Sequence, residues 1–451
     1  MAESAPAGGG SPRPLPGLPR SDTPCGMKRA HSDGNRPFNP ETLALGFGYD
    51  PWLSEGAIKP PVFLTSTFQF KSAAEGKAFF EVAYGLRDQK PGEAMGLIYS
   101  RLNNPNLEMF EDRMAAWDQT EAGAVFASGM AAISTSLLAL LQPGDHVIYA
   151  APVYGGTHFL LQHVLPRYGI EVHQVLSGGE AHEAMRAKAA EIGPEKVRML
   201  FLETPANPTL AMVDIAAVSQ LAATLGDRAE GGRRCVTAVD NTFLGPVFQR
   251  PALFGADLVI YSATKFIGGH SDLIAGVVTG ERGLIDSIKL MRTILGTMAA
   301  PFIGWLLLRS LETVSVRMRR QAKSARILAQ LLAEHPKVLR VEYPTLWPED
   351  DPRRELYSRQ CTGPGSLIAF EVEGGEEAAF RVLDRFEVAR LAVSLGGTET
   401  LVEHPRTMTH ADVPPDELER LGVTSGMIRI SVGIEHLSDL RRDLRHALAG
   451  A

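Results

Sequence analysis

The sequence is poor in cysteine, and the few cysteines it has are scattered. Of its 451 residues only three are cysteine, namely Cys25, Cys235 and Cys361, and no two of them form a CxxC pair. An odd and widely spaced set does not build a disulfide framework or a zinc site. We therefore expect no metal centre, and a reducing cytoplasm is the simplest location.

An excess of positive charge and a long apolar run are also missing. Forty-five lysines and arginines face 52 aspartates and glutamates, so the formal net charge is −7. This balance argues against nucleic acid or an anionic membrane as the main partner. The best candidate for a membrane span, residues 124–141, is interrupted by four hydroxyl residues, and the N-terminus lacks the pattern of a secretory signal. The remaining composition is typical of a soluble globular protein.

The first 40 residues have little with which to build a core. They contain 8 prolines, 6 glycines and 4 serines. Such a segment buries too little apolar surface to offset its ordering entropy, so we expect a disordered tail over residues 1–40. Met27, near its end, is a candidate for the true start of translation. Residues 41–100 are expected to be irregular and extended.

From about residue 105 onward, helical patterns alternate with short apolar strands. Alternating strands and helices predict an α/β fold with a mostly parallel sheet. After a polar helix predicted over residues 311–332 the pattern changes, and it indicates a smaller α+β domain at the C-terminus. The strands expected in these two parts are Ala124–Phe126, His146–Ala150, Val197–Leu202, Val236–Val239, Leu258–Tyr261, Ser366–Val372 and Met427–Val432.

A lysine flanked by hydroxyl residues follows one of these buried strands. Lys265 comes after Leu258–Tyr261, with Ser262 and Thr264 just before it. Ligands of open α/β sheets bind at the carboxyl ends of the strands, and a desolvated lysine there can form an imine with an aldehyde. The two hydroxyls could hold a phosphate beside it. An ordinary surface lysine is the alternative.

Three further groups stand at predicted strand ends. Asp240 ends the strand at 236–239, and a buried carboxylate there needs a cationic partner, such as a pyridinium N–H, unless it caps a helix. Ser128, Gly129 and Met130 open a long apolar helix, whose N-terminus either cradles a phosphate or is merely capped by serine. Tyr154 is suited to stacking on a planar ring, or to a place in the core. Together the four groups predict a pyridoxal 5'-phosphate (PLP) site.

The lysine segment, Ser262–Asp272, closely resembles the lysine motif of the Cys/Met-metabolism PLP enzymes, the cystathionine γ-synthase-like family. The resemblance extends from about residue 42 to the C-terminus. Its other motifs are Pro61–Phe68, Tyr99–Arg101, Ser128–Met130, Glu203–Pro208, Ser394–Gly397 and Ile428–Glu435. It implies PLP-dependent transferase fold type I, aspartate-aminotransferase-like, with a mostly parallel central sheet and a smaller C-terminal α+β domain.

The resemblance also implies a division of the chain. Residues 41–115 would be an arm that contributes to the neighbouring subunit's site. Residues 116–315 would be the large PLP-binding domain, and residues 316–451 the small C-terminal domain. An arm of this kind requires a homo-oligomer, and the family usually forms a tetramer that is a dimer of active dimers.

Roles for individual residues follow from the same resemblance. Lys265 would be the Schiff-base lysine, Asp240 would pair with the pyridine nitrogen, and Tyr154 would stack on the ring. The phosphate would be held by the groups at Ser128, Gly129, Met130, Ser262 and Thr264, and by Tyr99 and Arg101 of a neighbouring subunit. Asn207 would lie by the ring hydroxyl. Arg429 would bind the carboxylate of a small amino acid substrate, for which a guanidinium is well shaped, with Ser394 and Val393 beside it.

The implied chemistry is removal of a proton from Cα by Lys265, followed by deprotonation at Cβ and loss of the γ-substituent, with Tyr154 a candidate acid. Val393 stands where cystathionine-handling relatives often carry a glutamate, which favours α,γ-elimination of L-methionine or a related amino acid. Gly156 and Thr293 instead resemble cystathionine enzymes. The alternatives are therefore γ-replacement on an O-acylhomoserine and a cystathionine γ-lyase activity. The stretch 81–96 matches no motif that we can interpret.

Readings from other classes fit less well. The segment Ser262–Lys265 matches the S-x-x-K pattern of serine β-lactamases, but the accompanying Lys-Thr-Gly and Ser-Asp-Asn tripeptides do not occur in the chain. A non-enzymatic relative would be expected to have lost Lys265, Asp240 or Arg429, and all three are present. An aminotransferase of the same fold is disfavoured by the Ser394–Gly397 motif and by His270–Asp272.

Overall fold

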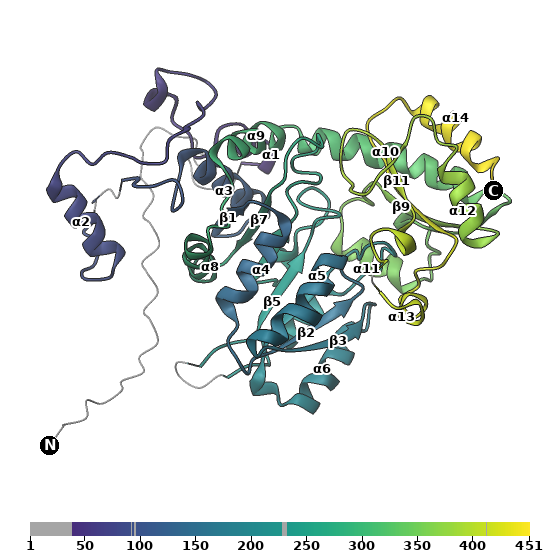
Figure 1. The fold of residues 1–451 in the computed structure, drawn as a ribbon, viewed down its shortest axis with the longest axis horizontal. Coiled ribbons are helices and arrows are strands. Elements are labelled where there is room, and N and C mark those ends of the chain that lie inside the picture. Colours follow the sequence, from purple (N-terminus) through teal and green to yellow (C-terminus); the bar gives the residue numbers. More distant parts are fainter. Residues whose placement is uncertain (1–37, 92, 94–95, 228–231, 412) are drawn as a thin grey trace.

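The computed structural model describes residues 38–91, 93, 96–227, 232–411 and 413–451. The tail predicted over residues 1–40 and the alternative start at Met27 lie almost wholly outside these residues. Within them, two sheets organise the chain, and Figure 1 shows the larger sheet in the middle of the molecule and the smaller one toward the C-terminus.

The larger sheet has seven strands in the order β1-β7-β6-β5-β4-β2-β3. Only β7 runs antiparallel to its neighbours, β1 and β6, so the prediction of a mostly parallel α/β sheet is confirmed. Except for the edge strand β3, its strands are buried almost throughout because helices cover both faces, which explains why they appear in the sequence as mostly apolar runs. The strands are β1 (Ala122–Phe126), β2 (His146–Ala151), β3 (Glu171–Leu176), β4 (Val197–Glu203), β5 (Val236–Asp240), β6 (Leu258–Tyr261) and β7 (Gly276–Gly280).

The smaller sheet has five strands in the order β10-β11-β12-β9-β8. All neighbours are antiparallel except the short pair β10 and β11. Helices α12 and α14 pack against it, giving the α+β arrangement expected for the C-terminal part. Its strands are β8 (Val338–Glu342), β9 (Leu367–Val372), β10 (Arg390–Leu391), β11 (Leu401–Glu403) and β12 (Met427–Ser431).

The helices differ from the sequence prediction in two places. The polar helix predicted over residues 311–332 is α10, which begins only at Val314 because the preceding helix α9 ends at Leu311. The region predicted to be extended contains α2, whose Ser72 side chain accepts a hydrogen bond from the Glu75 N–H and so caps its first turn. The α-helices are α1 (Pro40–Gly46), α2 (Ala73–Ala83), α3 (Pro105–Asp118), α4 (Gly129–Leu140), α5 (Gly155–Phe159), α6 (Ala181–Ile192), α7 (Ile215–Ala222), α8 (Arg282–Leu295), α9 (Pro301–Leu311), α10 (Val314–Ala333), α11 (Pro352–Gln360), α12 (Gly375–Leu383), α13 (Pro415–Arg420) and α14 (Leu437–Leu448).

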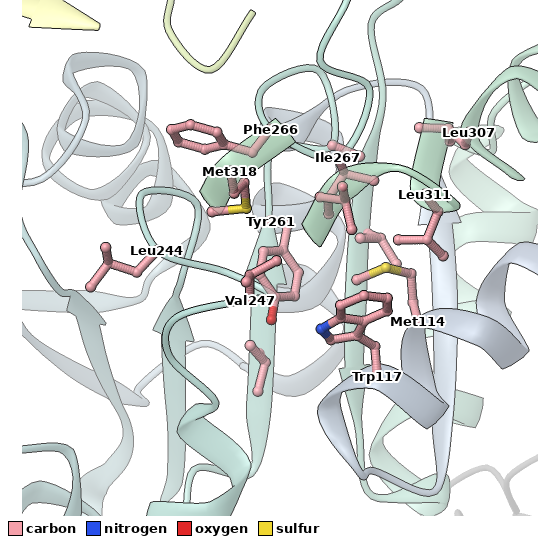
Figure 2. Packing of buried hydrophobic residues seen from close by; sticks show 14 of the residues in the cluster. Met114, Trp117, Leu244, Val247, Tyr261, Phe266, Ile267, Leu307, Leu311 and Met318 are labelled. Atoms are coloured by element: carbon pink, nitrogen blue, oxygen red, sulfur yellow. The ribbon is translucent and has the colours of Figure 1, made fainter. Parts of the chain in front are cut away.

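A core beneath β6 and α3 fixes the segment that carries the predicted lysine. Phe266 and Ile267, which directly follow Lys265, are each 1% exposed and point into a cluster with Trp117 and Met318 (Figure 2). Burying two such side chains contributes about 3–6 kcal/mol to stability. The backbone at Lys265 is therefore held by the core rather than by the surface.

Helix α10 joins the two sheets. Arg317, near its start, donates hydrogen bonds to the carbonyls of Phe266 and Ile267, and Gln321 donates to the carbonyl of Gly397 at 2.6 Å. Further along, α10 packs on β8 and β9 of the smaller sheet. The same helix thus supports a loop from each half of the molecule. None of the helices in the described part of the chain combines the length and apolarity of a membrane span.

Candidate active site

Lys265 lies just past the carboxyl end of β6, with its amine directed at a loop of the C-terminal part. Its Nζ donates a hydrogen bond to Ser394 Oγ at 2.7 Å. Burial, with a smaller contribution from the positive charge of Arg429, lowers the pKa of Lys265 to about 8, while Glu403 opposes the shift. A substantial fraction of this amine is therefore neutral near physiological pH, which is the state that attacks an aldehyde or takes up a proton.

The loop that meets Lys265 needs unusual backbone conformations. Ser394 has φ of +105°, which a residue with a side chain rarely adopts. At Gly396, with φ of +77°, a Cβ atom would lie 2.7 Å from the backbone nitrogen of Phe266. The loop therefore presses directly on the backbone after Lys265, and its strain is of the kind that accumulates at functional sites.

Two buried carboxyl groups end the neighbouring strands β4 and β5. Glu203 and Asp240 are partners in the sheet register and are 5% and 7% exposed. Asp240 Oδ1 accepts hydrogen bonds from the N–H and the hydroxyl of Thr242, and burial raises the pKa of Asp240. Within the described residues no lysine, arginine or histidine pairs with Asp240. A buried carboxylate without a cation is costly, so this position fits a guest with a positively charged ring nitrogen.

Glu203 holds the backbone on both sides of that position. Its Oε2 accepts from the N–H of Tyr154 at 2.7 Å, and its Oε1 accepts from the N–H of Asn207 at 2.9 Å. Burial and the charge of Asp240 raise the pKa of Glu203 to about 8. Glu203 thus connects two of the predicted ring-binding residues, Tyr154 and Asn207, to β4, which pairs with the strand that carries the third, Asp240.

The start of α4 forms an anion-binding corner with the end of β6. The Ser128 side chain accepts from the N–H of Ala131 at 3.0 Å, which leaves the N–H groups of Gly129 and Met130 without intrahelical partners. A Cβ atom at Gly129 would lie 2.9 Å from Ser262 Cβ, so only glycine permits this approach. Backbone N–H groups at a helix N-terminus beside a serine hydroxyl suit a phosphate.

The Thr264 hydroxyl is engaged differently from that of Ser262. It hydrogen-bonds the backbone of Ala275 twice, donating to the carbonyl at 3.2 Å and accepting from the N–H at 3.0 Å. Ser262 instead uses its N–H, which donates to the Thr242 hydroxyl, and its own hydroxyl has no hydrogen-bond partner among the described residues. The corner therefore offers the Ser262 hydroxyl more readily than that of Thr264.

Tyr154 stands at the start of α5 with 46% of its surface exposed. A Cβ atom at Gly156 would lie 2.8 Å from the Tyr154 ring and 3.1 Å from the sulfur of Met130. The ring is therefore placed next to the α4 corner by glycine, while its outer face remains open for stacking.

Arg429 is buried on β12 and is anchored through two of its nitrogens. Its Nη1 donates to Glu403 Oε1 at 2.8 Å and to Asn207 Oδ1 at 3.0 Å, and its Nη2 donates to the Ser394 carbonyl at 2.5 Å. A guanidinium has five N–H groups, so the Nε–H and one Nη2–H are left, and Nε is indeed buried without a partner. Two remaining donors on one guanidinium are suited to a carboxylate.

The geometry thus combines an aldehyde-reactive lysine, a place for a ring nitrogen, a phosphate corner and a carboxylate-binding arginine. A model of the Cys/Met metabolism PLP-dependent enzymes matches residues 41–449. The chain belongs to this family. It is accordingly a PLP-dependent enzyme of sulfur amino acid metabolism, and the predictions of family, fold type and cofactor are confirmed.

Named members of the family resemble the chain over nearly its whole length. It is 39% identical to L-methionine gamma-lyase of Pseudomonas deceptionensis, with 92% of this chain and 99% of that protein covered. It is 37% identical to cystathionine beta-lyase of Coxiella burnetii, over 92% of this chain and all of that protein. Cystathionine gamma-lyase from Lactobacillus plantarum, solved with L-serine, matches with a TM-score of 0.79 and 32% identity, over 92% and 99% of the two chains.

Tyr99 and Arg101, which are also predicted to bind the cofactor, lie apart from the other predicted cofactor-binding residues. Arg101 donates to the carbonyl of Thr293 at 2.8 Å and lies over the Tyr99 ring, 5.6 Å from its centroid. Neither side chain hydrogen-bonds to Lys265 or to any other predicted cofactor residue. Both follow α2 in the chain, and α2 projects from the body of the molecule in Figure 1.

The sequence interpretation overlooked two acidic residues of the site. Glu203 carries the same signal as Asp240, a carboxylate at the end of an apolar strand, and could have been found in that way. Glu403 follows only two residues of a short strand, and its pairing with Arg429 depends on the register of β11 and β12. That pairing is visible only in the folded chain.

Proposed function

We propose that the chain catalyses the α,γ-elimination of L-methionine or a related γ-substituted sulfur amino acid. With methionine and water as reactants, the products are methanethiol, 2-oxobutanoate and ammonia. The observation that carries this proposal is the bridge made by Ser394, whose hydroxyl accepts from Lys265 and whose carbonyl accepts from Arg429. A carboxylate bound at Arg429 places its Cα next to the lysine amine.

The residues described above fit PLP. Lys265 would bind its aldehyde, Asp240 its ring nitrogen, and Tyr154 and Asn207 its ring. Its phosphate would be held by Ser128, Gly129, Met130, Ser262 and Thr264, with Thr264 contributing least because its hydroxyl is engaged. When bound, PLP supplies an electron sink for the negative charge that develops on the substrate.

The side chains of the protein then move the protons. The Lys265 amine takes the proton from Cα, because burial lowers its pKa and makes the neutral form accessible, and a second proton from Cβ leaves in the same way. Tyr154, with its exposed ring and hydroxyl, is the candidate acid that protonates the departing sulfur. Arg429 holds the substrate carboxylate throughout, so that the Cα–H bond stays aimed at the amine.

The substrate preference is supported by Val393, which precedes Ser394 and is 56% exposed. An apolar side chain suits a methyl thioether better than a second zwitterionic end. The name of the Pseudomonas relative agrees with this preference. Gly156 supports the second candidate, action on cystathionine or γ-replacement on an O-acylhomoserine, since it leaves no side chain between Tyr154 and Met130. The cystathionine lyases among the relatives agree with that alternative.

The arm supports a homo-oligomer in which Tyr99 and Arg101 reach the phosphate of a neighbouring copy. We propose a tetramer built from two such dimers, with residues 41–115 as the arm, 116–315 as the large domain and 316–451 as the small domain. Large apolar side chains exposed along the arm are the expected contact surface, namely Leu45, Trp52, Leu53, Ile58, Leu64, Phe80, Tyr84 and Leu86. Within the described part of the chain Cys235 and Cys361 are free thiols, which is consistent with a cytoplasmic location.

A comparison of substrates tests the proposal. Release of 2-oxobutanoate from methionine, homocysteine and cystathionine is measured beside thioether formation from O-succinyl- or O-acetylhomoserine with cysteine. Fastest release from methionine is expected, and Lys265→Ala should abolish every reaction. Efficient thioether formation with negligible elimination would replace the lyase by the γ-replacement candidate.

A further inference from the structure

Glu403 and Arg429 form a fully buried ion pair that leaves one polar atom of each side chain unpaired among the described residues. The two residues face each other in the β11–β12 register and are 0% and 3% exposed. Their contact, at 2.8 Å, uses one oxygen and one nitrogen. Glu403 Oε2 and Arg429 Nε are both buried and find no hydrogen-bond partner among the residues that the structure describes. Such orphaned atoms are costly in a protein interior, so they mark a place that is organised for something other than stability.

Glu403 also interacts with the catalytic lysine. Its negative charge raises the pKa of Lys265, whereas Arg429 lowers it. The pKa of Glu403 is itself raised by burial and lowered by Arg429, by the Thr409 hydroxyl and by Lys265. Among the described residues, the titratable, charged or hydroxyl groups around the Glu403 carboxylate are therefore Arg429, Lys265, Thr409 and His410. His410 contacts the Thr409 hydroxyl at 3.0 Å. The adjacent His404 is turned away and bonds to Thr407 and to the carbonyl of Ser425.

We propose that Glu403 is a positioning residue that sets both the orientation of Arg429 and the charge of the substrate-carboxylate pocket. By occupying Nη1 it leaves the Nε donor for the substrate. By its charge it lowers the net positive charge of the group formed by Lys265, Arg429 and Glu403 by one unit. The pocket thus binds an amino acid carboxylate more weakly than Arg429 alone would, and the substrate is released more easily. The inference rests on the proposed role of Arg429.

Two substitutions separate the orientation from the charge. Glu403→Gln keeps an acceptor oxygen for Nη1 and removes the negative charge, so carboxylate binding should tighten about three- to tenfold. Glu403→Ala removes the acceptor as well, takes away the charged one of the three groups that anchor Arg429, and should weaken carboxylate binding at least about tenfold. Because opposite effects are expected from one position, a general loss of structure does not imitate the result.

The measurement is the dissociation constant of norleucine, a methionine analogue with no leaving group, from absorbance changes of the PLP-loaded enzyme. Pentylamine, which lacks the carboxylate, is titrated in parallel, and its affinity should change less than about twofold in Glu403→Gln. The pH midpoint of the visible absorption should also fall in this variant, because the charge that favours protonation near Lys265 is gone. Glu342→Gln removes a buried, ion-paired glutamate elsewhere in the same sheet and should change neither constant.

The outcomes are distinct. Tighter norleucine binding with unchanged pentylamine binding supports the role of Glu403. Equal norleucine affinity in wild type and Glu403→Gln, or weaker binding in both variants, overturns it and leaves Glu403 as a structural residue. If wild-type enzyme does not prefer norleucine to pentylamine, the role of Arg429 in the proposed function fails first, and the inference about Glu403 fails with it.

Discussion

The two sides of the site, which we call walls, differ in electrostatic character, because one presents buried carboxyl groups and the other a buried guanidinium. The wall on the larger sheet, the cofactor wall, presents Glu203 and Asp240 with hydrogen bonds but without a cation within the described residues. The wall on the smaller sheet, the substrate wall, presents Arg429 with donors still unused. The carboxyl groups of the first wall therefore suit the positively charged ring nitrogen of a guest, and the guanidinium of the second suits a carboxylate. Lys265 joins the two walls, because its backbone follows β6 of the larger sheet and its amine donates a hydrogen bond to Ser394 on the substrate wall.

Removing the residue that joins the walls should have the largest effect. Lys265→Ala is expected to reduce 2-oxobutanoate release by about 10³-fold or more, since both proton transfers depend on its amine. The yellow colour of the PLP-loaded protein should be lost or shifted in the absorption spectrum. Lys337→Ala, at a half-exposed lysine of the smaller sheet, is the matched control and should leave both unchanged. A colourless wild-type protein after incubation with PLP would contradict the assignment of Lys265 to the cofactor aldehyde.

Changing the charge of the cofactor wall should be next in size. Asp240→Asn replaces a charged acceptor opposite the ring nitrogen with a neutral one, and turnover should fall about 10- to 100-fold. Methionine KM should change little, because Arg429 is on the other wall. Asp443→Asn removes a buried aspartate that only caps backbone N–H groups of residues 387–389 and should lower stability alone. Equal turnover losses in both variants would contradict a special role for Asp240.

The phosphate corner tests whether the cofactor wall depends on close backbone contact. In Gly129→Ala the added Cβ meets Ser262 Cα and Cβ at 3.0 and 2.9 Å, so PLP affinity should fall about tenfold. Fluorescence titration of the cofactor-free protein measures this constant. Gly179→Ala adds a methyl group where nothing lies within 4 Å and should not affect PLP binding. An unaltered PLP affinity in Gly129→Ala would mean that the backbone shifts to make room for the added Cβ atom and that the close contact is not required.

The smallest expected effect concerns Glu203 and pH. Its pKa of about 8 in the fold lies above that of an ordinary carboxyl group, so the folded protein binds an extra proton between these values. The stability contribution of this group is complete at pH below about 4.5 and is lost as the pH rises through about 8. The unfolding free energy of cofactor-free protein should therefore decline less from pH 5 to pH 8.5 in Glu203→Gln than in wild type. The same change of unfolding free energy with pH in both proteins would mean that Glu203 has the pKa of an ordinary carboxyl group.

The two walls also differ in how far the sequence predicts them. Lys265, Asp240 and the Ser128–Met130 helix start could be found because each follows an apolar strand, and strand ends collect ligands in α/β sheets. The substrate wall has no such signal. Ser394 depends on a positive φ, Glu403 on a register with β12, and both on α10 holding the loop at Gly397. Arg429, Ser394 and Val393 were therefore identified by resemblance alone.

Helix α2 was missed for a related physical reason. Its Phe79 is buried against the neighbouring Phe70 and Phe80 within the arm rather than in the main core. The periodicity of such a small local cluster is weak in the sequence. The stretch 81–96 begins in this helix, and Arg87 ties its described part together through Glu81 and Glu93.

The independence of the two walls is tested most directly by one absorbance titration of Arg429→Lys, first with PLP and then with norleucine. Lysine cannot replace the two donors of a guanidinium. The PLP dissociation constant should stay within about twofold of the wild-type value, and norleucine binding should weaken at least about tenfold. Weakened PLP binding with unchanged norleucine affinity would contradict the assignment of Arg429 to a separate substrate wall.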